Sequence, residues 1–210
     1  MCARRRDAEG TAATRASRRA ELLSSIAEVF ADRGYAATTV REAAEAAGIL
    51  GGSLYYHFDS KESMVDEILS TFLNEMWADY DEVLASGMDA TGTLRALVAA
   101  SFKSIGRHRA AVVIYQNESK HLVQNERFGY LTESQRRFEN TWKGLLAQGV
   151  EEGALRSDLN TGLIYRFIRD TVWVAASWYQ PGGRLDAEEI AQQYLAMVLE
   201  GIQANQHPAT

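Results

Sequence analysis

The sequence predicts an all-α protein in which a small N-terminal three-helix domain precedes a larger helical domain. Three observations support this fold class. Apolar residues recur at three- and four-residue spacing along most of the 210-residue chain. The pairs Thr39–Glu42 and Asp186–Glu189 have the spacing of capping boxes, which mark helix starts. No segment alternates polar and apolar residues as a strand does, so we expect about nine helices and no sheet.

The first helix is expected to run from Ser17 to about Arg33 and to end at Gly34. Its apolar residues share one face and would cover the two helices that follow: Leu22, Leu23, Ile26, Val29 and Phe30. Residues 1–16 lack such periodicity, so we expect a basic, mobile arm there. Six arginines stand against Asp7 and Glu9 in residues 1–19, a net charge of +4 (6 − 2): Arg4, Arg5, Arg6, Arg15, Arg18 and Arg19.

The stretch from Thr38 to Lys61 has the spacing of a helix-turn-helix. A helix capped by Thr39 ends at Gly48, because glycine adopts a left-handed cap without strain. The run Gly51, Gly52, Ser53 then opens a second short helix with almost no side chain. Its N-terminal end can approach another surface closely. In a helix-turn-helix this end enters the DNA major groove.

This stretch resembles the DNA-binding signature of TetR-type transcriptional repressors over roughly residues 19–65. The matching segments are Gly34-Tyr35, Thr38-Thr39-Val40, Ala44, Ala47-Gly48-Ile49, Gly52-Ser53-Leu54-Tyr55, His57-Phe58 and Ser60-Lys61-Glu62. One position departs from the family, because Ala43 replaces a larger aliphatic residue and leaves local packing open. The resemblance implies phosphate contacts from Thr39, Tyr56, His57 and Lys61. It implies an approach to base edges by Arg41, Gly51, Gly52, Ser53 and Tyr55.

The aromatic residues of the second helix have a second interpretation. Leu54 and Phe58 are four residues apart and should both face inward. Tyr55 or Tyr56 could then be an ordinary core aromatic rather than a DNA contact. Both cannot be core, because neighbours on a helix lie about 100° apart. Likewise, the basic arm either follows a phosphate backbone or the minor groove, or is a solvated tail.

The remaining chain divides into helices separated by glycines and capping residues, giving predicted domains at 1–16, 17–61 and 62–210. The expected helices run from Ser60 to about Ser86, from the Gly87–Gly92 loop to about Ile105 with a break at Gly106, from Ala110 to about Val123, from about Arg127 to Glu152, from Asp158 or Asn160 through Tyr179, and from Asp186 onward after the Pro181-Gly182-Gly183 turn. The last two helices carry more apolar surface than a monomer needs. In the family such helices form a dimer interface, so we expect a homodimer rather than a monomer with a thick core.

A candidate small-molecule site lies near the C-terminal end. Arg169 and Trp173 are four apart and share a helix face, and Arg166 lies one turn before Arg169. An arginine beside a tryptophan suits a ligand with an apolar body and an anionic arm. The alternative is a structural pair of either arginine with Asp170. Further residues are expected to line the same cavity: Phe102, Tyr115, Gln116, Phe138 and Trp142.

Four longer segments are similar to one subgroup of the family, the TetR-type repressors of cholesterol (steroid C/D ring) catabolism that respond to a CoA thioester. They are ILGGSLYYHFDSKESMVDE, VVIYQNE, GVEEGALRSDL and RFIRDTVWVAASWYQPGG. The resemblance implies operator DNA, an acyl-CoA effector and a second copy of the chain as partners, with Arg169 and Trp173 reading the ester. TetR-type regulators of another pathway, responding to fatty acyl-CoA or cationic drugs, remain the alternative.

Composition and motifs exclude other classes. The net charge of −6 argues against a protein that coats nucleic acid. The single cysteine, Cys2, fits a reducing compartment, and neither a signal peptide nor a membrane span is evident, so we expect a cytoplasmic protein. The four histidines have no metal-site spacing and no catalytic motif is present, so we expect no cofactor, no metal and no enzyme. An acyl-CoA-hydrolysing enzyme is the least favoured alternative.

Overall fold

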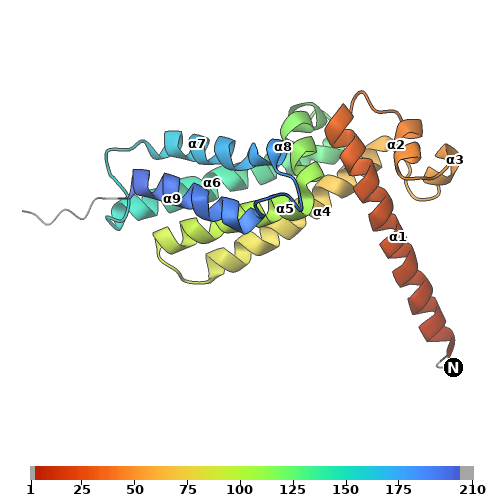
Figure 1. Ribbon diagram of the computed structural model, residues 1–210, viewed down its shortest axis with the longest axis horizontal. Helices are drawn as coiled ribbons and strands as arrows, with labels where there is room; N and C mark the ends of the chain where they lie inside the picture. The colour runs from red at the N-terminus through yellow and green to blue at the C-terminus, as the bar shows by residue number, and fades with distance from the viewer. Residues whose placement is uncertain (1–2, 204–210) are drawn as a thin grey trace, which may run out of the picture.

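The computed structural model of the protein describes the backbone of residues 3–203 and the side chains of residues 17–203. The described part is helical, with one isolated antiparallel bridge between Leu155 and Gln203 and no strand, so the all-α prediction is confirmed. The helices, shown in Figure 1, are α1 (Ala3–Arg33), α2 (Val40–Ala46), α3 (Gly51–Leu54), α4 (Lys61–Ala85), α5 (Ala90–Leu122), a 3-10 turn (Glu126–Phe128), α6 (Gly129–Glu151), α7 (Thr161–Trp173), α8 (Ala175–Trp178) and α9 (Ala187–Ile202).

The helices form a head and a body. The head contains α1, α2 and α3, and the body contains α4 to α9 lying alongside one another (Figure 1). Within the body, α5 is central, because it packs against α4, α6, α7, α8 and α9 and also reaches α1 of the head. The long α4 begins beside the head and continues through the body, as expected of a connecting helix. None of the described helices is both long enough and apolar enough to cross a membrane.

Helix α1 begins at Ala3, not at Ser17, which corrects the predicted start. The physical reason is that alanine and arginine are strong helix formers and no proline interrupts the segment, so helix can form without an apolar face. Figure 1 shows this part of α1 extending away from the rest of the molecule. The mobility expected for residues 1–16 stays a prediction.

The core of the head is built as the apolar spacing predicts. Leu22, Ile26 and Phe30 of α1 are buried, and so are Leu54 and Phe58, which confirms that the last two face inward. Ala43 is fully buried as well, so the helix-turn-helix packs closely around the small side chain at the position that departs from the family.

Helix starts follow the predicted capping residues. Thr39, Ser60 and Asp186 each accept a hydrogen bond from the backbone three residues on, and each forms a capping box. Asn160, rather than Asp158, caps α7. These matches are expected because a cap is a local interaction between neighbouring residues.

Helix α5 continues through Gly106, where a break was predicted. A Cβ atom at this glycine would lie 3.4 Å from Ala187 Cβ and 3.7 Å from the Tyr179 hydroxyl oxygen. Glycine therefore serves the close approach of α9 and of the segment before it, rather than ending the helix. The irregularity lies two residues later, because His108 has non-helical angles (φ −129°, ψ 34°) and kinks α5.

Candidate DNA-binding and effector sites

The start of α3 is open to the outside of the head. A Cβ atom placed at Gly51 or Gly52 would meet no atom within 4 Å, and neither residue has a positive φ. Nothing in the described part of the chain therefore requires glycine at these two positions. Leu50, which precedes them, is exposed although it is apolar. A free helix start without side chains is what close approach to a major groove needs.

Tyr55 and Tyr56 both lie on the surface, with 58% and 90% of their areas exposed. The alternative that either is a core aromatic is therefore wrong. Helix α3 itself ends at Leu54, and hydrogen-bonded turns continue the chain to Phe58. Ser53 is half-buried between the open glycines and these two tyrosines.

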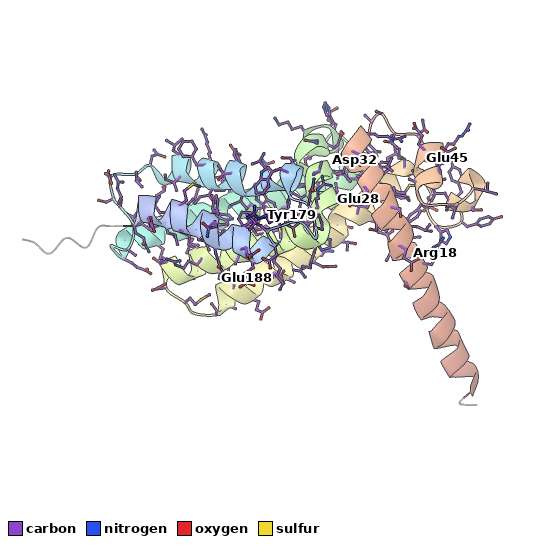
Figure 2. The ribbon with its side chains drawn as sticks, viewed as in Figure 1. Arg18, Glu28, Asp32, Glu45, Tyr179 and Glu188 are labelled. Atoms are coloured by element: carbon purple, nitrogen blue, oxygen red, sulfur yellow. The ribbon has the colours of Figure 1, made fainter. Side chains whose placement is uncertain are left out.

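The exposed face of α2 presents one cation. Arg41 is 85% exposed at its side chain and lies 3.6 Å from Glu45, a loose pair that a phosphate can replace (Figure 2 labels Glu45). Thr39 is exposed, but its hydroxyl group donates to Glu42 Oε2 at 2.8 Å and accepts from the Glu42 amide. The Glu42 carboxylate accepts hydrogen bonds from the amide and hydroxyl groups of Thr39, and these bonds lower the pKa of the Glu42 carboxyl group.

Lys61 is turned toward the protein, not toward solvent. Its ammonium group donates to the carbonyl oxygens of Tyr35 at 2.6 Å and Thr38 at 2.8 Å. The same group lies 4.3 Å from the centroid of the Tyr35 ring. The structure therefore places Lys61 as an internal tie between α4 and the α1–α2 connection, and the phosphate contact expected from this side chain stays a prediction.

Arg19 has a comparable structural role that the sequence did not reveal. Its guanidinium group contacts both carboxylate oxygens of Glu67 on α4, at 2.6 Å for the shortest distance, and donates to the carbonyl oxygen of His57. It also lies 4.2 Å from the centroid of the Phe58 ring. Arg18, its neighbour, pairs with Glu21 at 3.0 Å. Two of the six arginines counted toward the basic arm are thus used within the protein. The other four lie outside the described side chains.

The body contains a cavity of about 560 Å³ between α4, α5, α6 and α7. It is lined by Phe72, Tyr115, Gln116, Ser119, Lys120, Gln135, Phe138, Trp142, Tyr165, Ile168, Arg169, Asp170, Val172, Trp173 and Val174. The structure therefore brings together Arg169, Trp173, Tyr115, Gln116, Phe138 and Trp142, as predicted.

Aromatic rings form the apolar wall of this cavity. The Trp173 ring lies 5.8 Å from Phe138 and 6.2 Å from Phe72, both nearly perpendicular to it. Phe72 also contacts Tyr115, at 6.1 Å between centroids. Burial raises the pKa of the Tyr115 phenol to about 12, so it is a neutral hydrogen-bonding group at physiological pH.

One cation of the cavity has a partner within the chain. Arg169 Nε lies 2.6 Å from Asp170 Oδ1, so the predicted alternative of an Arg169–Asp170 pair is present. The hydrogen bond that Arg169 donates to Asp170 raises the pKa of the guanidinium group. Both side chains are partly exposed, at 43% and 64%, so the pair is weak and can be opened by an anionic ligand at little cost.

Two predicted residues lie elsewhere. Phe102 is buried and packs against Tyr194, 5.6 Å between centroids, so it belongs to the α5–α9 core. Arg166 is exposed and lines a separate surface hollow with Lys143, Asn160, Gly162 and Leu163. Arg166 and Arg169 are about one helical turn apart, and only Arg169 lines the cavity.

The sequence reasoning also missed cavity residues. Tyr165 and Ile168 precede Arg169 and Trp173 at helical spacing, and that periodicity was a usable signal. Gln135, Ser119 and Lys120 had no such signal, because nothing in the sequence shows that α5 and α6 face α7 here. Over the described residues, no cluster of three or more His, Cys, Asp or Glu side chains is placed to hold a metal ion.

Comparisons with known proteins identify the family of both parts of the chain. Residues 22–68 match the model of bacterial regulatory proteins of the tetR family, and residues 87–202 match the tetracyclin repressor-like C-terminal domain. The repressor KstR2 of Rhodococcus jostii is 54% identical over 188 residues, which span 90% of this chain and 92% of that protein. The solved structure of the ketosteroid transcriptional regulator KstR2 of Mycobacterium tuberculosis is 49% identical, with a TM-score of 0.86 over 90% of this chain and 96% of that one.

A more distant solved structure shares the fold. AibR, determined in complex with isovaleryl coenzyme A and operator DNA, is 20% identical, with a TM-score of 0.71 over 86% of this chain and 97% of that one. The repressors that resemble this chain are regulators, not enzymes. The chain belongs to the TetR family of bacterial transcriptional regulators and is a repressor closely related to KstR2.

Proposed function

We propose that the protein binds operator DNA as a homodimer, is released by an acyl-CoA thioester, and controls steroid catabolism. The observation that carries the proposal is the aromatic cavity that includes Arg169, because two of the helices that form it, α4 and α5, also contact α1 of the head. Two relatives add support. The KstR2 structure is described as a ketosteroid regulator, and AibR, which has the same fold, binds isovaleryl coenzyme A and operator DNA.

The cavity chemistry fits a thioester with a bulky acyl group. Its volume of about 560 Å³ lies within the usual range of small-molecule sites. Trp173, Phe138 and Phe72 offer flat apolar surfaces for a ring system. Lys120 and Arg169 supply cations for the phosphates of coenzyme A. The only acidic lining residue is Asp170, which pairs with Arg169, so a cationic drug finds no free carboxylate among the lining residues.

An apolar face on α7 and α8 supports a homodimer. Leu163, Phe167, Val174 and Trp178 are all exposed, and their spacing places them within about 60° of one another around the helix axis. Met197 adds an exposed apolar side chain on α9. We assign this face to a second copy of the chain, because operators read by paired heads require two-fold symmetry.

Release then follows from linkage. Two heads that bind successive major grooves must lie about 34–36 Å apart. A ligand changes that spacing only through its difference in affinity between the DNA-bound and released shapes. The proposed effector fills the space beside α4 and α5 and favours a shape in which the heads no longer match the operator.

The proposal is tested with an operator that the protein selects from a random DNA library. A labelled operator is titrated with a panel of CoA thioesters that carry fatty acyl groups or bicyclic ring acids of the steroid C/D type. Free acids and a cationic dye serve as controls. We expect the bicyclic thioesters to release the DNA at the lowest concentration. Equal release by free acids, or release by the dye alone, would contradict the acyl-CoA assignment.

A further inference from the structure

The cavity and the head are joined within two turns of α5. Tyr115, Gln116, Ser119 and Lys120 line the cavity, and Glu118 projects from the same turn toward the head. Glu118 Oε1 accepts a hydrogen bond of 3.2 Å from the backbone amide of Tyr35. This bond links the segment of α5 that forms one cavity wall directly to the connection between α1 and α2.

Tyr35 connects the head to two helices of the body. Its carbonyl oxygen receives the Lys61 ammonium group, and its ring packs edge-on against Phe30 at 5.4 Å. Burial and the carboxylates of Glu62 and Glu118 raise the pKa of the phenol to about 12. The residue therefore touches α1, α4 and α5 at once, and it lies four residues before Thr39, which caps the start of α2.

Glu118 also lies against Gly34, the residue before Tyr35. Gly34 has φ of +86°, which suits glycine, and a Cβ atom there would lie 3.7 Å from Glu118 Oε1. The carboxylate thus sits directly against the backbone turn that ends α1. Only one other hydrogen bond between described side chains of α5 and the head is present, from Arg109 to Glu28 at 3.4 Å (Figure 2 labels Glu28 where α1 crosses the body).

Both contacts lie on the part of α5 that follows the kink at His108. The same part carries the four cavity residues of this helix, whereas Phe102, before the kink, packs on α9. A rotation of the segment after the kink would therefore move the cavity wall and Glu118 together.

From this geometry we infer that Glu118 is the positioning residue that couples the occupancy of the cavity to the orientation of the DNA-binding head. The coupling acts through its hydrogen bond to the Tyr35 amide. This inference rests on the proposed role of the cavity as the effector site. Glu118 is not among the residues that line the cavity, so in this role it acts through α5 and not by contact with the effector.

The decisive quantity is the coupling ratio, the operator dissociation constant with saturating effector divided by that without it. The probe is the bicyclic-acid CoA thioester, and the operator is the library-selected one. Glu118→Ala removes the acceptor and should reduce the ratio about tenfold, the loss expected for a hydrogen bond to a charged group. Glu118→Gln keeps a side-chain oxygen and should retain a ratio near the wild-type value.

Asn117→Ala, an exposed neighbour on α5, is the matched control and should leave the ratio unchanged. A wild-type ratio in Glu118→Ala overturns the inference. So does a variant that loses thermal stability and affinity for both ligands while its ratio is unchanged, because that is the pattern of a purely structural residue.

A second measurement needs no effector. Operator binding to the wild type should change amide hydrogen exchange in residues 112–122, because linkage acts in both directions. Glu118→Ala should abolish that change while still binding the operator. If it persists, Glu118 does not carry the coupling. Should no thioester release the wild type, the effector assignment fails, and the exchange experiment alone decides the role of Glu118.

Discussion

The Lys61 ammonium group lies 2.6 Å from the carbonyl oxygen of Tyr35 and 4.3 Å from the centroid of its ring. One side chain at the start of α4 thus contacts both the backbone and the aromatic ring of a single residue in the α1–α2 connection. With Thr38 as a further acceptor at 2.8 Å, all of this bonding joins the start of α4 to the α1–α2 connection. The consequence is a role in stability, which mutation can separate from DNA binding.

Lys61→Met should lower the free energy of unfolding by about 2–3 kcal/mol, because two backbone oxygens lose a charged donor. Urea denaturation measures the change. Lys103→Met is the control, since its exposed ammonium group is 3.9 Å from Asp79 and should change stability by less than about 0.5 kcal/mol. If Lys61 contacts a phosphate instead, the variant should have normal stability. The slope of log affinity against log salt concentration for operator binding should then fall by about one.

Tyr55→Ala should weaken operator binding at least about tenfold, because a contact at a base edge is lost. Its free energy of unfolding should change by less than about 0.5 kcal/mol, since the ring is exposed. Fluorescence anisotropy with labelled operator and urea denaturation check the two parts. Met88→Ala, exposed in the α4–α5 loop, should affect neither. Normal operator binding by Tyr55→Ala would leave the ring without a role in recognition.

Arg169→Met should keep operator affinity but require at least about tenfold more acyl-CoA for release, because a charge-assisted contact to the ligand is removed. The Asp170 carboxylate is exposed, so losing its arginine partner should cost little stability. Arg136→Met is the control, as that arginine pairs with Glu133 on the surface of α6. Titration of the labelled operator complex with thioester gives the answer, and unchanged release would remove Arg169 from the effector site.

Two glycines of α6 should respond oppositely to alanine. A Cβ atom at Gly149 would lie 2.6 Å from Leu155 Cδ1, so Gly149→Ala forces the packing apart and should cost about 1–3 kcal/mol. Gly144 has no atom within 4 Å of such a Cβ, so Gly144→Ala should stabilise the helix by up to about 1 kcal/mol. Thermal denaturation of the pair measures both, and equal effects would contradict this packing.

Stability should fall at alkaline pH. Burial raises the pKa of Tyr115 to about 12, above the value near 10 expected in the unfolded chain. Between these two values the unfolded state holds fewer protons, so the free energy of unfolding decreases as pH rises. Tyr115→Phe should reduce the loss between pH 10 and 12, whereas Tyr55→Phe, at an exposed ring, should not. Denaturation curves across that range provide the comparison.

Local signals predicted much of the fold. Thr39, Ser60 and Asp186 cap the expected helices because a capping interaction needs only neighbouring residues. The course of α5 could not be predicted in this way. Gly106 resembles a helix end in sequence, and only the approach of Ala187 shows why glycine stands there.

The candidate sites divide along the same line. Arg169 and Trp173 were found by their spacing on one helix, and the open start of α3 by its two glycines. Phe102 was misplaced, and the internal hydrogen bonds of Lys61 were missed, because their surroundings come from other parts of the fold. Phe102 meets Tyr194, and Lys61 meets the backbone of Tyr35, which are partners that no periodicity reveals.

The contact of Arg19 with Glu67 and the His57 carbonyl oxygen has a practical consequence for dissecting the molecule. It holds the first turns of α4 against the head. Any hinge between the head and the body must therefore lie after Glu67. A fragment cut at residue 61 would strip Arg19 of its carboxylate partner. An isolated DNA-binding fragment that keeps its native structure must therefore include the first turns of α4.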